Sequence, residues 1–366
     1  MKIPFIDLTR QYKNLELEID KVVKDTFSRG DFILGENVEK FEKEFATFCG
    51  VKYCVGVASG TDALLLSLRA LGVGPGDEVI TTSFTFIATI LPILYLGAKP
   101  ILVDINPDTY QIEAKEIEKV ITKKTKAIIP VHLFGIPAPM NEITKIAKKY
   151  KLYVIEDACQ AHGAEINKER CGSFGDLAAF SFYPTKSLGA PGDAGAIVTN
   201  NKKLADNICI LRNVGRTQAY KHDLLGYNSR LDTLHAGVLL IKLKRLEEWN
   251  DKRRKLAQLY DKLLTDLPIV LPPTPSNSLR PNCYMYTVRT PKRDKLSEFL
   301  RKNGVSCAIY YPIPTHLQKA LRELGYTRGD FPIAERTARE VLSLPLYPEL
   351  KEVEIRYICA KIREFF

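Results

Sequence analysis

The chain has 366 residues, which is long enough for two domains or for one large α/β domain with an appendage. Its 45% of hydrophobic and 26% of charged residues are close to the averages of soluble globular proteins, and they exclude a disordered, collagen-like or coiled-coil protein. The formal net charge of +10 comes from lysines scattered over predicted helices rather than gathered with aromatic residues, so we expect no nucleic-acid partner.

Short strands alternate with helices from residue 53 onward. Before them, Val38, Phe41, Phe45 and Phe48 recur at the spacing of one apolar helix face. The alternation indicates βαβ units and a parallel sheet covered on both faces. The predicted strands are 53–57, 78–82, 100–105, 126–132, 151–157, 177–183 and 195–200, and the predicted helices are 61–71, 86–96 and 138–149.

The pattern changes in the C-terminal third of the chain. A long helical pattern from Leu231 to Leu264 precedes five prolines within residues 268–281, which end helices and force extended or turn backbone. Strands at 285–290 and 307–311, mixed with helices, suggest a smaller α+β domain. The predicted domains are 1–245, with the N-terminal helices, and 246–366.

The end of the first strand, GVASGTDALLLSL, is a candidate phosphate site. Ligands of open parallel sheets bind where strands end and helices begin. Gly60 ends the strand and Thr61 opens a helix whose free N–H groups and positive dipole end suit a phosphate. A plain helix cap by Ser59 or Thr61 is the alternative, and the segment matches neither GxGxxG nor the P-loop.

Two later strand ends carry further polar groups. Asp157 ends a strand that should be buried, and Gln160 lies three residues on. Ser181 and Lys186 follow a strand in AAFSFYPTKSLGAPGDAGAIVTN, where a lysine among apolar and small residues could be desolvated and a better nucleophile. Taken singly, these residues could equally be a helix cap or a surface charge.

Together these groups are the set that pyridoxal 5'-phosphate requires. The helix start can hold the phosphate, and the lysine amine can form a Schiff base with the aldehyde. The aspartate can keep the pyridine nitrogen protonated, so that the ring accepts carbanion charge. We therefore expect an enzyme that uses this cofactor.

At these residues the chain resembles the DegT/StrS family of pyridoxal-phosphate-dependent nucleotide-sugar aminotransferases. The resemblance runs from PFIDL at the start to YYPIPTHLQ and to LSLPLYP at 342–348. It implies the aspartate-aminotransferase type I fold, an α/β fold with a large, mostly parallel-sheet domain and a smaller C-terminal α+β domain. It also implies a homodimer with shared active sites.

The resemblance implies a role for each matching residue. Lys186 would be the Schiff-base lysine, and Asp157 would pair with the pyridine nitrogen. Gln160 would bond the phenolic oxygen of the ring. The other implied cofactor contacts are Phe86, stacked on the ring, Gly60, Thr61 and Ser181 at the phosphate, and Asn228 from the neighbouring subunit. Without the family, Phe86 would be a core aromatic residue and Asn228 a turn or cap residue.

The implied reaction is transamination with glutamate as the amino donor. The freed Lys186 amine would move a proton as general base and then acid. Some relatives that act as dehydratases carry His at this position, whereas this chain has lysine.

The segments YKHDLLGYNSRLD, KLKRLEEWNDKRRKLAQLYDKL and YYPIPTHLQ look most like the branch that acts on dTDP-3-keto-6-deoxyhexoses. The implied product is a 3-amino-3,6-dideoxy sugar. Tyr310-Tyr311-Pro312 departs from the His-Tyr-Pro of many members. The candidate substrate contacts are Tyr183, Lys221, His222, Arg230, Tyr311 and His316. Lys221 and Arg230 could meet the diphosphate, or they could be surface charges.

Several alternatives stay open. The same chemistry could act on a UDP-linked 3-keto sugar or on a 4-keto sugar. The alternation of strands and helices also allows a nicotinamide oxidoreductase, but the first βα turn lacks the dinucleotide fingerprint. A non-catalytic nucleotide-sugar-binding or regulatory protein could keep both the cofactor and Lys186.

Location and metal content are also predicted. No apolar run approaches the roughly 20 residues that span a bilayer, and the N-terminal residues do not resemble a signal peptide. The eight cysteines include no CxxC pair and the five histidines are scattered. We expect a cytoplasmic protein with free thiols, no membrane association and no metal site.

Overall fold

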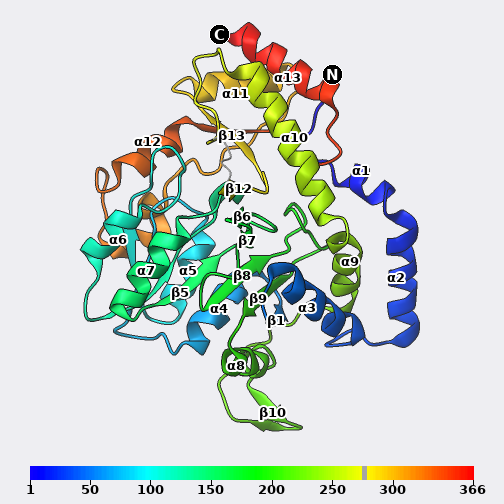
Figure 1. Cartoon of the computed structure of the whole chain (residues 1–366), viewed down its shortest axis with the longest axis vertical. Coiled ribbons are helices and arrows are strands. Elements are labelled where there is room, and N and C mark those ends of the chain that lie inside the picture. Colours follow the sequence, from blue (N-terminus) through cyan, green and yellow to red (C-terminus); the bar gives the residue numbers. More distant parts are fainter. Residues whose placement is uncertain (274–277) are drawn as a thin grey trace.

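The computed structural model describes residues 1–273 and 278–366, and its centre is a seven-stranded sheet of order β1-β9-β8-β5-β4-β2-β3 (Figure 1). Its strands are β1 (Tyr53–Val57), β2 (Glu78–Thr82), β3 (Lys99–Val103), β4 (Thr125–Ile129), β5 (Tyr153–Asp157), β8 (Leu177–Ser181) and β9 (Gly195–Thr199). β2, β3, β4, β5 and β8 are parallel, and β9 runs antiparallel between β8 and β1. The predicted α/β class with a mostly parallel sheet is therefore confirmed.

Helices cover both faces of this sheet, because successive side chains of a strand point to opposite faces. Along β8, Leu177 and Ala179 join an apolar cluster with the helix α4 (Gly60–Ala70), whereas Ala178 and Phe180 join a second cluster with α3 (Glu36–Cys49). The other large-sheet helices are α5 (Leu91–Tyr95), α6 (Ala114–Val120), α7 (Met140–Tyr150), α8 (Lys202–Arg212) and α9 (Thr233–Leu243).

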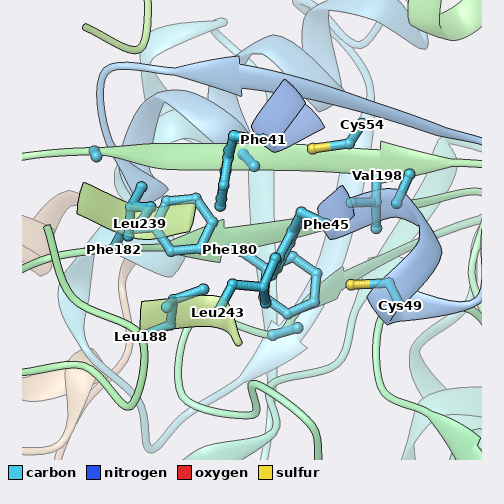
Figure 2. Close-up of a cluster of buried hydrophobic side chains, with 14 of the residues drawn as sticks. Phe41, Phe45, Cys49, Cys54, Phe180, Phe182, Leu188, Val198, Leu239 and Leu243 are labelled. Atoms are coloured by element: carbon cyan, nitrogen blue, oxygen red, sulfur yellow. The ribbon is translucent and has the colours of Figure 1, made fainter. Parts of the chain in front are cut away.

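An aromatic group forms the centre of the second cluster (Figure 2). The Phe45 ring stacks on Phe41 with centroids 5.4 Å apart. It meets Phe180 and Phe182 edge-on at 5.0 and 5.2 Å. The predicted helix face of α3 thus packs against the strand that leads to Lys186.

Two predicted helices are each divided in the structure. Residues 86–96 form a 3-10 helix, Ile87–Thr89, followed by α5, because Pro92 lacks an N–H and favours the first turn of a new helix. The 231–264 pattern forms α9 and α10 (Leu246–Leu264). The first division leaves Phe86 in extended backbone beside the site.

The C-terminal part surrounds a two-stranded sheet. β13 (Tyr286–Arg289) confirms the strand predicted at 285–290 and pairs antiparallel with β14 (Val341–Leu344). The strand predicted at 307–311 is wrong: within the described residues only Ala308 forms a bridge there, to Ser343. β14 pairs with β13 along one edge and, among the described residues, bridges only to Ala308 along the other, and the prolines that follow in YYPIP lack the N–H that would extend a ladder.

The helices around this small sheet are α10, α11 (Arg293–Lys302), α12 (Pro332–Glu340) and α13 (Glu352–Phe365). Ile3 bridges Val305 and joins their apolar cluster, so the first residues lie beside the C-terminal part (Figure 1). The domain boundary at residue 245 stays a prediction. Pro275, counted among the five prolines, lies outside the described residues.

The remaining elements are short or peripheral. They are α1 (Leu8–Lys13), α2 (Glu16–Arg29), β6 (Glu165–Ile166), β7 (Glu169–Arg170), β10 (Arg216–Gln218), β11 (Lys221–His222), β12 (Leu279–Arg280) and the 3-10 helices Leu133–Gly135, Thr315–Leu317 and Lys319–Leu324. The β10–β11 hairpin projects beyond α8 at the lower end of Figure 1. In the described part of the chain, no helix has the length and apolarity to cross a membrane.

Candidate active site

One cavity of about 410 Å³ lies where several strands of the large sheet end. It is within the size range of small-molecule sites. The sequence-predicted residues that line it are Gly60, Thr61, Phe86, Asp157, Gln160, Ser181, Tyr183, Lys186 and Tyr311. They come together because parallel strands place their carboxyl ends at one edge of a sheet.

The N-terminus of α4 forms one wall of the cavity. The Ser59 hydroxyl accepts a hydrogen bond from the Asp62 amide at 3.1 Å, which caps the helix. The amides of Gly60 and Thr61 belong to the first turn, which has no intrahelical acceptors. A Cβ at Gly60 would lie 2.7 Å from the Ser181 Cβ, so only glycine allows this approach. The wall therefore suits a phosphate.

The Asp157 carboxyl group lines the cavity, and its residue is 6% exposed. The Thr89 hydroxyl donates to Oδ2 at 2.8 Å and the Cys159 amide donates to Oδ1 at 3.3 Å. The backbone of Asp157 is held by Pro130 and His132. The carboxylate at the strand end thus has the partners that its burial demands.

Lys186 approaches the cavity from the turn after β8. Its amide donates to the Tyr183 carbonyl at 2.8 Å, and its Nζ lies 5.0 Å from the centroid of the Tyr284 ring. Behind this turn, the Lys242 amine donates to the Gly189 carbonyl at 2.7 Å. Burial lowers the pKa of Lys242 to about 8. The loop of Lys186 is thereby fixed on the side away from the cavity.

Gln160, Tyr311 and Phe86 form a connected group. The Gln160 Oε1 accepts from the Phe134 amide at 2.7 Å, which leaves Nε2 to donate to the Tyr311 hydroxyl at 3.3 Å. The rings of Tyr311 and Phe86 stack at 5.8 Å. Burial raises the pKa of Tyr311, so its hydroxyl is protonated at neutral pH. This group offers a ring face and polar hydrogens to the same space.

Five predicted residues are not among those that line the cavity in the described chain. Lys221 and His222 lie on exposed β11, and the Lys221 amine is 3.4 Å from Asp223. Arg230 donates to Asn213 Oδ1 at 2.9 Å, and Asn228 is exposed. His316 is buried with its Nε2 3.2 Å from the Glu335 carboxylate. Their roles in binding stay predictions.

Sequence reasoning missed three groups around the predicted residues. Thr89 was hidden in a predicted helix, although Thr85 and Thr89 have the spacing of helical neighbours. Tyr284 had no sequence signal that tied it to Lys186. Asn282 is buried, and its amide donates to the Gln160 carbonyl at 3.1 Å and to Ser187 Oγ at 3.4 Å.

The groups present fit pyridoxal phosphate. The first turn of α4 would hold the phosphate, the buried Asp157 carboxylate would pair with a protonated ring nitrogen, and Lys186 would bind the aldehyde carbon. Phe86 and Gln160 would meet the ring face and its phenolic oxygen. The close approach of Gly60 to Ser181 is an independent sign that this corner is shaped for a ligand.

Known proteins resemble the chain over its whole length. Residues 13–363 match the DegT/DnrJ/EryC1/StrS aminotransferase family. A crystal structure of DesV from S. venezuelae superimposes with a TM-score of 0.97 at 43% identity, over 100% of this chain and 98% of that one.

Curated relatives carry different names. A "Pleiotropic regulatory protein" of Geobacillus stearothermophilus is 46% identical over 100% of this chain and 99% of its own. A "UDP-N-acetyl-3-dehydro-alpha-D-glucosamine 3-aminotranferase" of Acidithiobacillus ferrooxidans is 45% identical over 99% of this chain and 97% of its own. A "dTDP-3-amino-3,4,6-trideoxy-alpha-D-glucose transaminase" of Streptomyces venezuelae is 42% identical over 100% of this chain and 96% of its own.

Proposed function

The chain belongs to the DegT/DnrJ/EryC1/StrS aminotransferase family, and we propose that it moves an amino group from glutamate to a nucleotide-linked keto-hexose. The proposed acceptor is a dTDP-3-keto-6-deoxyhexose. The chain is a pyridoxal-phosphate-dependent sugar aminotransferase. The proposal adds the donor, the nucleotide and the 3-keto position, and its product is a 3-amino-3,6-dideoxy sugar. The cofactor chemistry depends on one observation: Lys186, Asp157 and the start of α4 line a single cavity.

The residues of the cavity divide the chemistry among them. Pyridoxal phosphate supplies an aldehyde for amines and a ring that accepts electrons from the adjacent carbon. Lys186 Nζ would hold the aldehyde carbon, and the free amine would move a proton at the donor carbon as general base and then acid. Asp157 would pair with the protonated ring nitrogen. Tyr183 and Tyr311, which also line the cavity, would contact the sugar.

Support for the dTDP branch comes from the three segments quoted above and from the name of the Streptomyces venezuelae relative. The Acidithiobacillus ferrooxidans relative, named for a UDP-linked 3-keto sugar, supports the alternative nucleotide. Both names describe amination at the 3-position, which favours a 3-keto over a 4-keto acceptor.

The test is amination of a substrate panel. Purified protein is given ¹⁵N-labelled glutamate and dTDP-, UDP- and GDP-linked 3-keto and 4-keto hexoses, and products are identified by mass analysis. We expect the label at carbon 3 of the dTDP sugar, and none with Lys186→Ala. If only UDP-linked or 4-keto sugars are labelled, the proposed dTDP-3-keto substrate is wrong.

A regulatory role is the second candidate, because one relative of 46% identity is named a regulatory protein. It predicts that the protein binds pyridoxal phosphate but does not convert glutamate to 2-oxoglutarate in a single-turnover assay. Release of 2-oxoglutarate would reject this candidate.

A homodimer with shared sites is part of the proposal. α2 and the residues that follow it expose Leu17, Phe27 and Ile33, and the β10–β11 hairpin exposes Tyr220. A second copy could cover this apolar surface and receive Asn228, Lys221 and His222 in its cavity. Sedimentation should give the mass of two chains. Mixing Lys186→Ala with Asn228→Ala protein should restore activity, because half of the sites in mixed dimers are intact.

We place the reaction in the cytoplasm. Support comes from the eight cysteines, which are free thiols in the structure, as is usual in a reducing compartment.

A further inference from the structure

Two buried threonines lie beside the Asp157 carboxylate in the wall of the cavity. The Thr89 hydroxyl is 2.8 Å from Asp157 Oδ2, and the Thr85 hydroxyl is 2.9 Å from that of Thr89. Thr85 is 3% exposed and Thr89 is 1% exposed, so water has little access to these bonds. Valine would fill the volume of either threonine but could make neither bond.

The chemistry of the groups fixes the direction of both hydrogen bonds. An ionised carboxylate only accepts, so Thr89 gives its single proton to Asp157. In the pair of hydroxyls, Thr85 must therefore donate and Thr89 accept. The Cys159 amide donates to the other carboxylate oxygen. Both oxygens are thus held, and lone pairs remain for a positive group in the cavity.

The backbone places Thr89 and Phe86 in one rigid turn. The Thr89 amide donates to the Phe86 carbonyl at 3.0 Å, within the short 3-10 helix that Pro92 separates from α5. The Phe86 ring would meet the face of the cofactor ring, and the Thr89 hydroxyl donates to the carboxylate that would pair with the ring nitrogen. Movement of this turn would disturb both contacts together.

We propose that Thr89 is a positioning residue, which orients the Asp157 carboxylate toward the ring nitrogen of bound pyridoxal phosphate. Thr85 orients the Thr89 hydroxyl by donating a hydrogen bond to it. The measurement of kcat rests on the proposed function. The measurement of cofactor affinity does not, because it needs no sugar. Hydrogen bonds to charged groups change equilibrium constants by about tenfold or more.

The test compares three variants. Thr89→Val removes the hydroxyl at constant shape, and Thr89→Ser keeps it. Thr81→Val is the matched control, because Thr81 is equally buried on β2 but its hydroxyl donates to the Ile129 carbonyl at 2.8 Å, away from Asp157. The dissociation constant of pyridoxal phosphate is measured by titration, and kcat and KM are measured with ordinary and α-deuterated glutamate.

We expect Thr89→Val to bind the cofactor at least about tenfold more weakly and to lower kcat more than it raises KM, with a larger isotope effect, because proton removal becomes slower. Thr89→Ser should restore these values, and Thr81→Val should leave them unchanged. In an Asp157→Asn background, Thr89→Val should add little, because the two residues act as one unit.

Cofactor affinity in Thr89→Val equal to that of the wild type would overturn the inference, and so would failure of Thr89→Ser to restore it. If Thr89→Val does not fold, Thr85→Val replaces it and should give a smaller loss of affinity in the same direction; no loss would also overturn the inference. A wild type that binds the cofactor but aminates no sugar would contradict the proposed function alone.

Discussion

A methyl group at Gly195 should displace the start of α4 and weaken cofactor binding. Gly195 begins β9 and pairs with Val57 of β1 and Ser181 of β8. A Cβ there would lie 2.4 Å from the Ser59 carbonyl carbon and oxygen and 2.9 Å from the Gly60 nitrogen. All three are backbone atoms, which cannot move aside by changing rotamer.

The size of the displacement follows from these distances. Ordinary van der Waals contact begins at 3.4 Å, so the backbone of Ser59 must retreat by 3.4 − 2.4, or about 1 Å. Overpacking of this kind costs about 1–3 kcal/mol of folding stability. A misplacement of about 1 Å in a binding site can cost on the order of 100-fold in activity. The displaced amides are those expected to hold the phosphate.

The assay is a titration of Gly195→Ala with pyridoxal phosphate, together with thermal unfolding in its presence and absence. We expect a dissociation constant at least about tenfold higher and a smaller rise of the melting temperature on cofactor addition. Gly74→Ala is the control, because nothing lies within 4 Å of a Cβ at Gly74. Affinity equal to that of the wild type would refute the assignment of the phosphate to the first turn of α4.

Three further outcomes are expected. Lys186→Ala should abolish turnover and prevent borohydride from fixing the cofactor to the chain, as seen by mass spectrometry, whereas Lys202→Ala, at an exposed lysine paired with Asp206, should keep both. Phe45→Ala should lose about 3–5 kcal/mol of unfolding free energy in urea, because its fully buried ring contacts several others; a loss below about 1 kcal/mol would contradict this packing. Burial lowers the pKa of Lys242 from 10.5 to about 8, so between these pH values the unfolded chain binds one proton more than the folded chain. The free energy of unfolding of the wild type should therefore rise relative to that of Lys242→Met as the pH rises from 8 to 10.5. Parallel curves of unfolding free energy against pH for the two proteins would contradict the lowered pKa.

The sequence predicted the sheet and much of the cavity lining for one physical reason. Strands of about five apolar residues are recognisable locally, and the direction of parallel strands brings their ends together. Gly60, Asp157 and Lys186 are far apart in the chain, yet each lies at or just after the end of a strand, so their shared cavity could be expected before any coordinates.

Other parts of the site depend on contacts that local patterns do not encode. Thr89 reaches Asp157 only because Pro92 divides the predicted helix. The segment at 307–311 has strand-like residues, but in the described structure only Ala308 of it bridges to β14. The positions of Asn228 and Lys221 relative to a cavity depend on a second copy, which one sequence cannot place.

The cavity takes its walls from residues between Ser59 and Tyr311. A ribosome delivers Gly60 early and Tyr311 late, so a nascent chain with a complete large sheet still has an open binding site. The wall formed by Tyr284, Met285, Tyr310 and Tyr311 is added only when the C-terminal part docks on the large sheet. Completion of the cavity is therefore coupled to folding of the last third of the chain.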